Sequence, residues 1–508
     1  RHIGSSLSGS YRLKSKDGED IIAGRDETLD KTRYKNNQLP VTFRATYRTD
    51  KMQIRSLVGF VHDNIPVSEI DGNVIFSQHD YESSKFRRTN PTLKNSVIYS
   101  GSYVFMLPKN YSLDITPSFN YTHTNDRYLY SVNDFQEVKR NANEDAYNFS
   151  ISASASKFLG GGHSLTAGIN GGQWNNNLKY TGTNQYNDKF RLSFAYGNVG
   201  YNYYTSKFFI NANLGVMWEG SDINKITKND VYPFTHLYVK NVLSKKHTLS
   251  AYFQYATNSP TISKKASDIL QENEYLYITG NPYLKNSRHI SVNLQYMWIP
   301  TKQFNMSAYG KYYGNYNRNV TVYSPYKDGE AVIRGYENSG NFNLTTLGIN
   351  ASLKLFSGKL QLSAGPELYF YKSTGIYSNH YNPFVIDAQA ILYLGQFYVG
   401  VHYTSPERQL RDNTNDIYRS RNFHSIGGGW SNSNWYIKLT AADFFNKGWV
   451  GATLTMNSDY YSEYRVNYGT AHHPRLNVTV RYTINYGKKV QRGAEVSEQS
   501  ATSSGILK

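Results

Sequence analysis

The chain has 508 residues with 55 Lys and Arg against 38 Asp and Glu, a formal net charge of +17, and it contains no cysteine. The lack of cysteine excludes a disulfide scaffold and a zinc site with cysteine ligands. Tyrosine supplies 47 residues while charged residues make up only 18%. So many aromatic residues argue against disorder, and together with so few charges they suit a wall between water and hydrocarbon.

The chain opens on Arg1-His2-Ile3-Gly4, without a starting Met or an apolar signal segment. We therefore expect a processed or truncated product. The best candidate for a membrane-spanning helix, 384–401, contains Asp387, Gln389 and Gln396 and has Gly395-Gln396 at its centre. A hairpin suits this stretch better than a membrane-spanning helix.

Apolar and polar residues alternate with period two from one end of the chain to the other, which predicts β-strands with two different faces. The opening strand is expected near residues 3–13. Later strands show the same alternation, and the closing strand, 475–486, is the clearest of them. The best further examples are 41–48, 111–122, 148–156, 290–298 and 347–355.

Short and long connections between these strands follow each other in turn. Short turns are expected near 107–110, 160–163, 205–207, 244–246, 300–303, 357–359, 395–396 and 431–434. Long polar connections are expected at 124–145, 177–188, 219–233, 258–287, 314–341, 372–383, 405–421 and 443–474. This alternation is typical of a membrane barrel with short periplasmic turns and long extracellular loops.

The fold class predicted from these patterns is all-β, a transmembrane antiparallel β-barrel of about 20–22 strands. We expect the barrel to span residues 1–486. A short basic and then polar C-terminal tail, 487–508, follows it, and its composition favours disorder. The predicted location is the bacterial cell outer membrane.

Three stretches carry a resemblance to a known family. Pro260-Thr261-Ile262 precedes Gly280-Asn281-Pro282-Tyr283-Leu284-Lys285, Ala441-Ala442-Asp443-Phe444-Phe445-Asn446 ends the penultimate strand, and Arg475 and Tyr486-Gly487-Lys488-Lys489 flank the closing strand. In these stretches the chain resembles the barrel of TonB-dependent outer-membrane receptors of Gram-negative bacteria, in particular the outer membrane beta-barrel protein family.

The resemblance implies uptake of a ligand across the outer membrane, in which the ligand passes when a plug is displaced. Members of the family carry that plug and a box gripped by a periplasmic energising protein before the barrel, and neither is visible in this sequence. Two alternatives therefore stay open. One is a structural or accessory barrel subunit of an outer-membrane protein complex, and the other is a passive pore.

Aromatic side chains in two of the long connections are the candidate ligand-binding residues, because stacked rings recognise sugars and flat chelates without needing charge. They are Tyr275, Tyr277, Tyr283, Tyr316, Tyr323 and Tyr326. Expected partners are outer-membrane lipid and lipopolysaccharide, a periplasmic energising protein and outer-membrane lipoprotein partners. Nucleic acid is not expected, because a membrane barrel makes such binding improbable.

Basic residues gather near the first hairpin, where they either line the lumen for anionic substrates or meet lipopolysaccharide phosphates at the outer rim. They are Arg44, Arg48, Lys51 and Arg55.

The run 412–416 has oxygen ligands at the spacing of a calcium loop, but Ile417 stands where the glycine of the sharp turn belongs, so a solvated loop is favoured. His472-His473 has no accompanying carboxylates. No nucleophile, base and orienting residue come together, so we expect neither an enzyme nor a bound cofactor or metal.

Overall fold

The computed structural model describes residues 6–14, 21–77, 84–133, 136–414, 416–445, 450–468, 474–483 and 506. The His472-His473 pair and the tail other than Ile506 lie outside these described residues. Ile506 itself is buried among residues of the barrel mouth. No helix in the described part is both long and apolar enough to cross a membrane.

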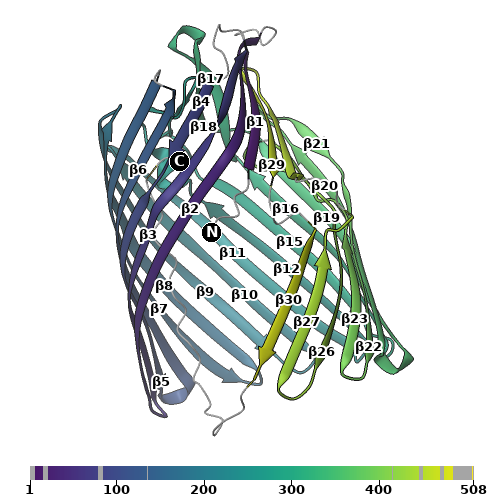
Figure 1. Cartoon of the computed structure of the whole chain (residues 1–508). Coiled ribbons are helices and arrows are strands. Elements are labelled where there is room, and N and C mark those ends of the chain that lie inside the picture. Colours follow the sequence, from purple (N-terminus) through teal and green to yellow (C-terminus); the bar gives the residue numbers. More distant parts are fainter. Residues whose placement is uncertain are drawn as a thin grey trace.

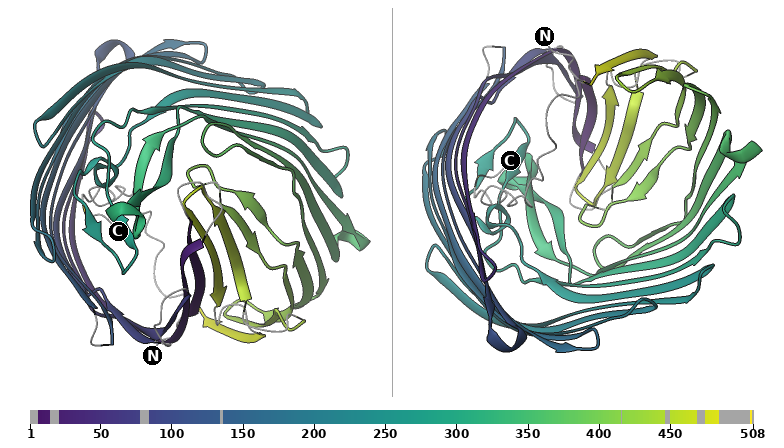
Figure 2. Two further views of the ribbon diagram at one scale, coloured as in Figure 1. Left: turned by 90° about the horizontal axis from the view of Figure 1, so that it is seen from above. Right: turned by 90° about the horizontal axis from the view of Figure 1, so that it is seen from below.

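Nineteen strands, each antiparallel to its neighbour, form a curved wall that encloses a wide lumen (Figures 1 and 2). In order they are β2 Ile21–Arg48, β3 Met52–Ser77, β5 Thr92–Leu107, β6 Tyr111–Val132, β7 Gln136–Gly160, β8 His163–Gly182, β9 Tyr186–Tyr204, β10 Phe208–Ile223, β11 Ile226–Ser244, β12 His247–Asn258, β15 Ser287–Trp298, β16 Phe304–Tyr316, β19 Asn341–Leu355, β20 Leu360–Ser373, β22 Phe384–Leu394, β23 Phe397–Thr404, β26 Phe423–Ser431, β27 Trp435–Ala442 and β30 Arg475–Tyr482. The all-β antiparallel barrel predicted from the sequence is confirmed.

Shorter strands extend this sheet at the end of the barrel that carries the long connections. They are β1 Ser6–Lys14, β4 Ser84–Thr89, β21 Asn379–Tyr381, β24 Arg408–Leu410, β25 Ile417–Ser420, β28 Val450–Asn457 and β29 Tyr461–Tyr468. β1 joins β2 to β29, and β29 continues through β28 to β25. The opening strand expected near 3–13 is therefore present as β1.

The short turns lie at one end of the barrel, as expected. They include the single-turn helices η1 Pro108–Asn110 and η3 Phe356–Gly358. The stretch proposed as a hairpin forms β22 and β23, which are joined at Gly395 and Gln396. Gly395 has a φ of +66°, a conformation that glycine adopts without steric cost.

Three of the long connections differ from the expectation. Residues 124–145, 177–188 and 219–233 continue mainly as paired strands, and among their described residues only Asn133, 183–185 and 224–225 lie outside strands. Alternate residues of these stretches are buried in the mouth, and the buried set mixes polar side chains such as Asp126 and Asn176 with apolar ones such as Leu178. The period-two apolar signal therefore fades although the strands continue. The wall consequently projects well beyond the apolar belt.

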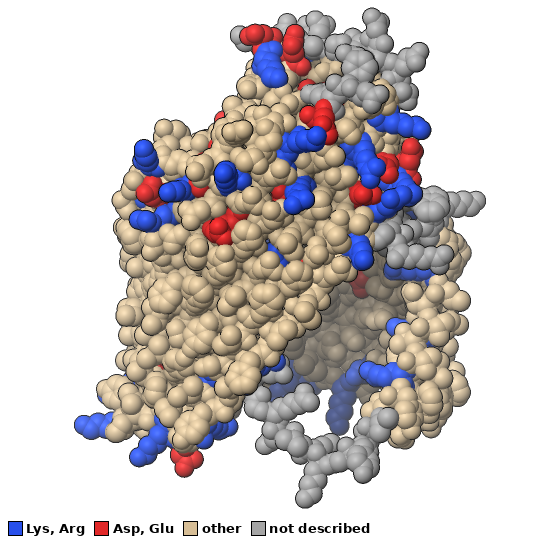
Figure 3. Space-filling model, turned by 60° about the vertical axis from the view of Figure 1, so that its left-hand side comes forward, with Lys and Arg blue, Asp and Glu red and all other residues tan. Residues whose placement is uncertain are grey.

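The apolar belt is visible on the outer surface as a zone almost free of charged residues (Figure 3). Its side chains point outward and are exposed, for example Phe43, Ile169 and Val199 at 71%, 68% and 62%. Lys, Arg, Asp and Glu flank the belt above and below (Figure 3). An exposed apolar band bounded by charge matches the hydrocarbon layer of a membrane.

Along one side of the barrel the described strands do not complete the wall. β30 pairs only with β27 there, and β2 pairs beyond Thr28 only with β3. The surface is deeply hollowed on this side (Figure 3). Both strands run toward the short-turn end, because β2 enters the first short turn after Arg48 and β30 is antiparallel to the rising strand β27.

Candidate functional site at the barrel mouth

Two of the long connections fold back into the barrel mouth and pair there as a second, four-stranded sheet. Its strands are β13 Leu270–Gln271, β14 Leu276–Ile278, β17 Asn319–Tyr326 and β18 Ala331–Asn338. The helical turn α1 Ile262–Lys265 precedes β13, and the turn η2 Lys327–Gly329 joins β17 to β18. Seen from above, this inner sheet lies inside the ring of wall strands (Figure 2).

Apolar side chains hold the inner sheet against the wall. Ile262, Leu270 and Ile278 pack with wall residues Leu178 and Phe190, and Leu276 and Val332 pack with residues of β1, β28 and β29. Such burial stabilises each aliphatic side chain by about 1.5–3 kcal/mol. The inner sheet is therefore a packed part of the mouth.

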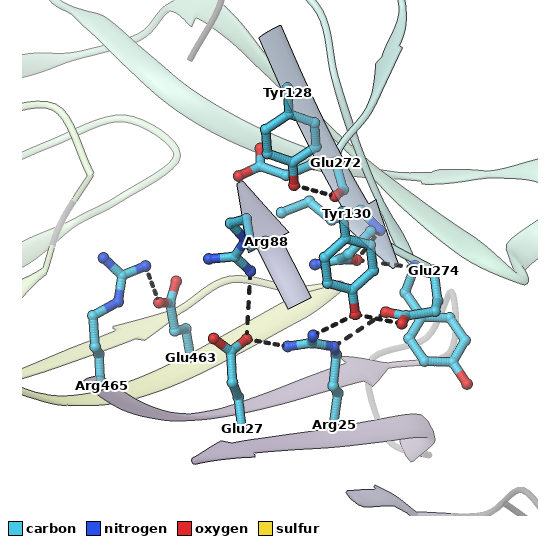
Figure 4. Close-up of polar contacts among 12 residues, drawn as sticks. Arg25, Glu27, Arg88, Tyr128, Tyr130, Glu272, Glu274, Glu463 and Arg465 are labelled. Atoms are coloured by element: carbon cyan, nitrogen blue, oxygen red, sulfur yellow. Dashed lines mark hydrogen bonds and ion pairs between the residues drawn. The ribbon is translucent and has the colours of Figure 1, made fainter. Parts of the chain in front are cut away.

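A buried acid–base network ties the tip between β13 and β14 to the wall (Figure 4). The Arg25 guanidinium, 2% exposed, lies 3.2 Å from the Glu274 carboxylate and 2.5 Å from that of Glu27. Arg25 also donates to the Tyr130 hydroxyl at 2.8 Å, and that hydroxyl donates to Glu274 at 2.5 Å. Arg88 lies 3.6 Å from the same Glu27 carboxylate. Charge-assisted hydrogen bonds of this kind are about twice as strong as neutral ones.

Glu272, two residues earlier, makes a second set of contacts with the wall and the inner sheet. Its backbone carbonyl accepts a hydrogen bond from the Tyr128 hydroxyl at 2.7 Å, and its carboxylate lies 3.5 Å from Arg334. Burial opposes its ionisation, but Arg334, Arg88 and Arg140 outweigh burial and lower the pKa of Glu272. This carboxylate is therefore held charged among arginines.

A fully buried arginine links its own connection to two further connections at the mouth. Arg318, 0% exposed, donates to the carbonyls of Thr374 at 3.1 Å and Tyr377 at 3.0 Å, and also to the carbonyl of Asp412. Its Nη1 lies 3.8 Å from the Asp412 carboxylate. One guanidinium thus satisfies backbone acceptors from two loops that are far apart in the sequence.

The six tyrosines proposed as ligand contacts all lie at the mouth, but they differ in accessibility. Tyr277 is 6% exposed and packs against Tyr326 at a ring-centroid distance of 4.8 Å. Tyr323 stacks on Tyr461 at 4.5 Å, and burial raises the pKa of its hydroxyl.

The remaining three are Tyr275, Tyr316 and Tyr283. The Tyr275 ring meets Phe76 edge-on at 5.9 Å, and the Tyr316 hydroxyl shares a hydrogen bond with that of Tyr312 at 2.7 Å. Tyr283 is 65% exposed, with the Lys228 ammonium 5.3 Å from its ring. Of the six, Tyr283 is therefore the one most open to a ligand from outside.

The residues that anchor the inner sheet were missed by sequence reasoning. Arg25, Arg88, Tyr130 and Glu274 stand in ordinary strand or loop patterns, and only the fold brings them together. Their one sequence signal is a pair of carboxylates, Glu272 and Glu274, at alternating positions in a connection otherwise read for its aromatic residues.

Two other expectations change with the structure. In the run 412–416, Asp416 is 5% exposed and Asp412 contacts Arg318, whereas Asn413 is exposed, so the described part of the run is partly packed into the mouth and partly solvated. Among the described residues no three His, Asp or Glu side chains gather as metal ligands. Arg44, Arg48, Lys51 and Arg55 flank the first short turn, at the end opposite the long connections. The structure therefore does not place these four residues at the rim that carries the long connections.

No family model and no curated protein matches the sequence. Solved structures do match. They include the copper transporter OprC, with a TM-score of 0.55, 11% identity, and 92% of this chain and 80% of that chain covered. The ferric enterobactin receptor PfeA, in complex with BCV-L6, matches at a TM-score of 0.51, 10% identity, and 91% and 81% coverage. The siderophore receptor PirA from Pseudomonas aeruginosa matches at a TM-score of 0.50 and 10% identity, with 91% of this chain and 80% of that chain covered. The chain therefore has the fold of solved outer-membrane transporters and receptors.

Proposed function

We propose that this chain is the barrel of an outer-membrane receptor that captures a ligand at its outer mouth and passes it through the lumen. The observation that carries the proposal is the inner sheet, which narrows the mouth and is anchored to the wall by the network around Arg25 and Glu274. A wide pore that admits solutes without selection has no use for such an obstruction. A receptor requires one, because it must admit its ligand and exclude other solutes.

The anchoring contacts suit a gate driven by ligand binding. Arg25, Tyr130 and Glu274 connect the inner sheet to the wall through hydrogen bonds that water or ligand groups can replace. A ligand that binds the displaced form of the sheet more tightly shifts the equilibrium toward that form by the difference in affinity. We propose a periplasmic energising protein as the partner that supplies the remaining work.

Tyr283 is the proposed first contact for the ligand, and the other five tyrosines become accessible when the inner sheet moves. The matching structures named above include a copper transporter and a ferric enterobactin receptor. By analogy we propose a metal ion or a metal complex as the ligand class. Flat aromatic chelates would stack on exposed tyrosine rings.

The test is uptake of copper and of iron–enterobactin by cells that lack their own receptors and produce this protein in the outer membrane. We expect one of these ligands to accumulate. Tyr283→Ala should reduce uptake about 2- to 10-fold, the loss of one stacking contact. Tyr204→Ala is the matched control, because Tyr204 is also 65% exposed but lies beside a short turn at the opposite end.

Three outcomes would contradict the proposal. Steady conductance in a planar bilayer without uptake would favour a passive pore. Stable co-purification with lipoproteins, again without uptake, would favour a structural subunit. Equal uptake by Tyr283→Ala and wild type would remove Tyr283 from the ligand path.

A further inference from the structure

A groove of about 500 Å³ crosses the outward, apolar face of the wall over strands β12 to β22. Leu294, Gly310, Leu347, Leu368 and Phe384 are direct neighbours across five consecutive wall strands, so they form one row on that face. The four side chains in the row are 45–54% exposed. The groove therefore faces the hydrocarbon.

The groove exists because β16 carries small residues where its neighbours carry large ones. Gly310 lies between Leu294 and Leu347, and Ala308 lies between Tyr296 and Ile349 in the next row. A Cβ built on Gly310 would meet only Leu347 Cδ2, at 3.5 Å, an ordinary contact distance. The space above Gly310 is thus open to an apolar group from outside.

Four lysines lie on the short turns of the same strands. Lys245 and Lys246 join β11 to β12, Lys302 joins β15 to β16, and Lys359 precedes β20. All four are exposed, and no carboxylate among the described residues lies within 4 Å of them. The three turns themselves contain no Asp or Glu. The four lysines therefore form a row of positive charge along three successive short turns, with no ion-pair partner among the described residues.

The ring pair formed by Trp298 and Phe304, with centroids 5.8 Å apart, places these turns at the membrane–water boundary, because aromatic residues concentrate there. From this boundary the groove reaches into the hydrocarbon. Leu249 is three residues from Lys246, and Gly310 is eight residues from Lys302. At about 3.3 Å per residue these separations are about 10 and 26 Å along strands. Because the strands are tilted by about 45°, Leu249 and Gly310 lie about 7 and 18 Å below the turns. This range of depths is close to the thickness of one leaflet.

We propose that the four lysines and the groove together bind an anionic phospholipid of the leaflet that faces the short turns. The phosphate headgroup lies against the row of lysines formed by Lys245, Lys246, Lys302 and Lys359, and one acyl chain lies in the groove over Gly310. The lysines supply the charge complement that an apolar membrane-spanning segment of another protein would not need. This proposal requires the barrel to span a membrane but does not depend on ligand uptake.

Native mass spectrometry of the full chain in detergent tests the proposal, with phosphatidylglycerol and phosphatidylethanolamine of equal chain length as probes. We expect the wild type to retain phosphatidylglycerol at least 10-fold more strongly. Changing all four lysines to Gln should abolish that preference, since each lysine near an anionic headgroup contributes about five-fold. Gly310→Leu should weaken retention of both lipids by filling the groove.

Lys51→Gln with Lys109→Gln is the matched control, because both lysines are exposed on short turns away from the groove. This variant should retain phosphatidylglycerol like the wild type. Equal retention of the two lipids by the wild type would overturn the proposal, as would full preference in the four-lysine variant. Exclusion of lipid by a co-purifying membrane protein would assign the groove to that protein. Circular dichroism confirms that each variant is folded, and none of these outcomes depends on transport.

Discussion

Arg318 shows how much of the mouth depends on one side chain. Replacing it with Met keeps most of its volume but leaves the carbonyls of Ser339, Thr374 and Asp412 without the guanidinium donor. The Tyr377 carbonyl keeps its hydrogen bond from the Ser373 hydroxyl. Unsatisfied buried acceptors cost about 1–3 kcal/mol each. We expect Arg318→Met to lower the local stability of these loops by about 3 kcal/mol or more, with faster proteolysis there and intact wall strands.

Arg408→Met is the control for this experiment, since Arg408 is exposed on the neighbouring strand β24. Limited proteolysis followed by peptide mapping measures both variants. If residues 374–377 and 411–414 resist cleavage equally in the two variants, the role assigned to Arg318 is wrong.

Asp268 is a second single residue with a large expected effect, because it makes the stability of the mouth depend on pH. Burial, and then a hydrogen bond and repulsion from Asp188, raise the pKa of Asp268 from 3.8 to about 9. The folded form therefore binds a proton that the unfolded form releases, so the stability from this group is complete below about pH 4 and falls as pH rises toward 9. Asn224 donates to the Asp188 carboxylate.

Asp268→Asn should remove this dependence, because an amide keeps a hydrogen-bond donor without titrating. We expect the segment 262–286 to be protected from proteolysis more strongly in the variant than in the wild type at pH 8. At pH 4 the two proteins should be alike. The proteolysis of the wild type and the variant should therefore be compared at pH 4 and pH 8. If the difference between them is the same at both pH values, the carboxyls of Asp268 and Asp188 do not share a proton.

At the scale of strands and turns, the sequence predicted the wall well and the mouth poorly. Alternation and turn chemistry are local, so they locate β22, β23 and the turn between them without tertiary information. The inner sheet depends on contacts such as Arg25 with Glu274, whose positions are 249 residues apart. No local pattern carries such a contact. For the same reason the tyrosines of 258–287 could be nominated from composition, but their burial could not be predicted.

The groove over Gly310, on the lipid-facing surface, is another feature that local sequence patterns could not predict. A glycine in a strand signals close backbone approach or missing packing, but sequence alone does not say which neighbours border it. The register places Leu294 and Leu347 beside it, and only then does the glycine become the floor of a groove. The lysines of separate turns become one row for the same reason, because the strand order places their turns next to one another.

For the whole molecule, the decisive feature is the side on which the described strands do not complete the wall. Backbone groups cannot face hydrocarbon unpaired, because each costs several kcal/mol there. β2 and β30 run in the same direction, so an all-antiparallel closure between them takes an odd number of further strands. With nineteen strands in the described wall, one or three additions give an even-numbered barrel, as single-chain bacterial barrels have.

Hydrogen exchange of the protein in its native membrane tests this closure. If further strands cover the edge, the amides of 476–482 in β30 should exchange as slowly as those of 435–442 in β27, which is paired on both sides. Half of the β30 amides point away from β27, because alternate residues of an antiparallel strand bond to opposite neighbours. Rapid exchange of that half alone would show that β30 remains an open edge in the membrane, and the closure argued from its direction would then be wrong.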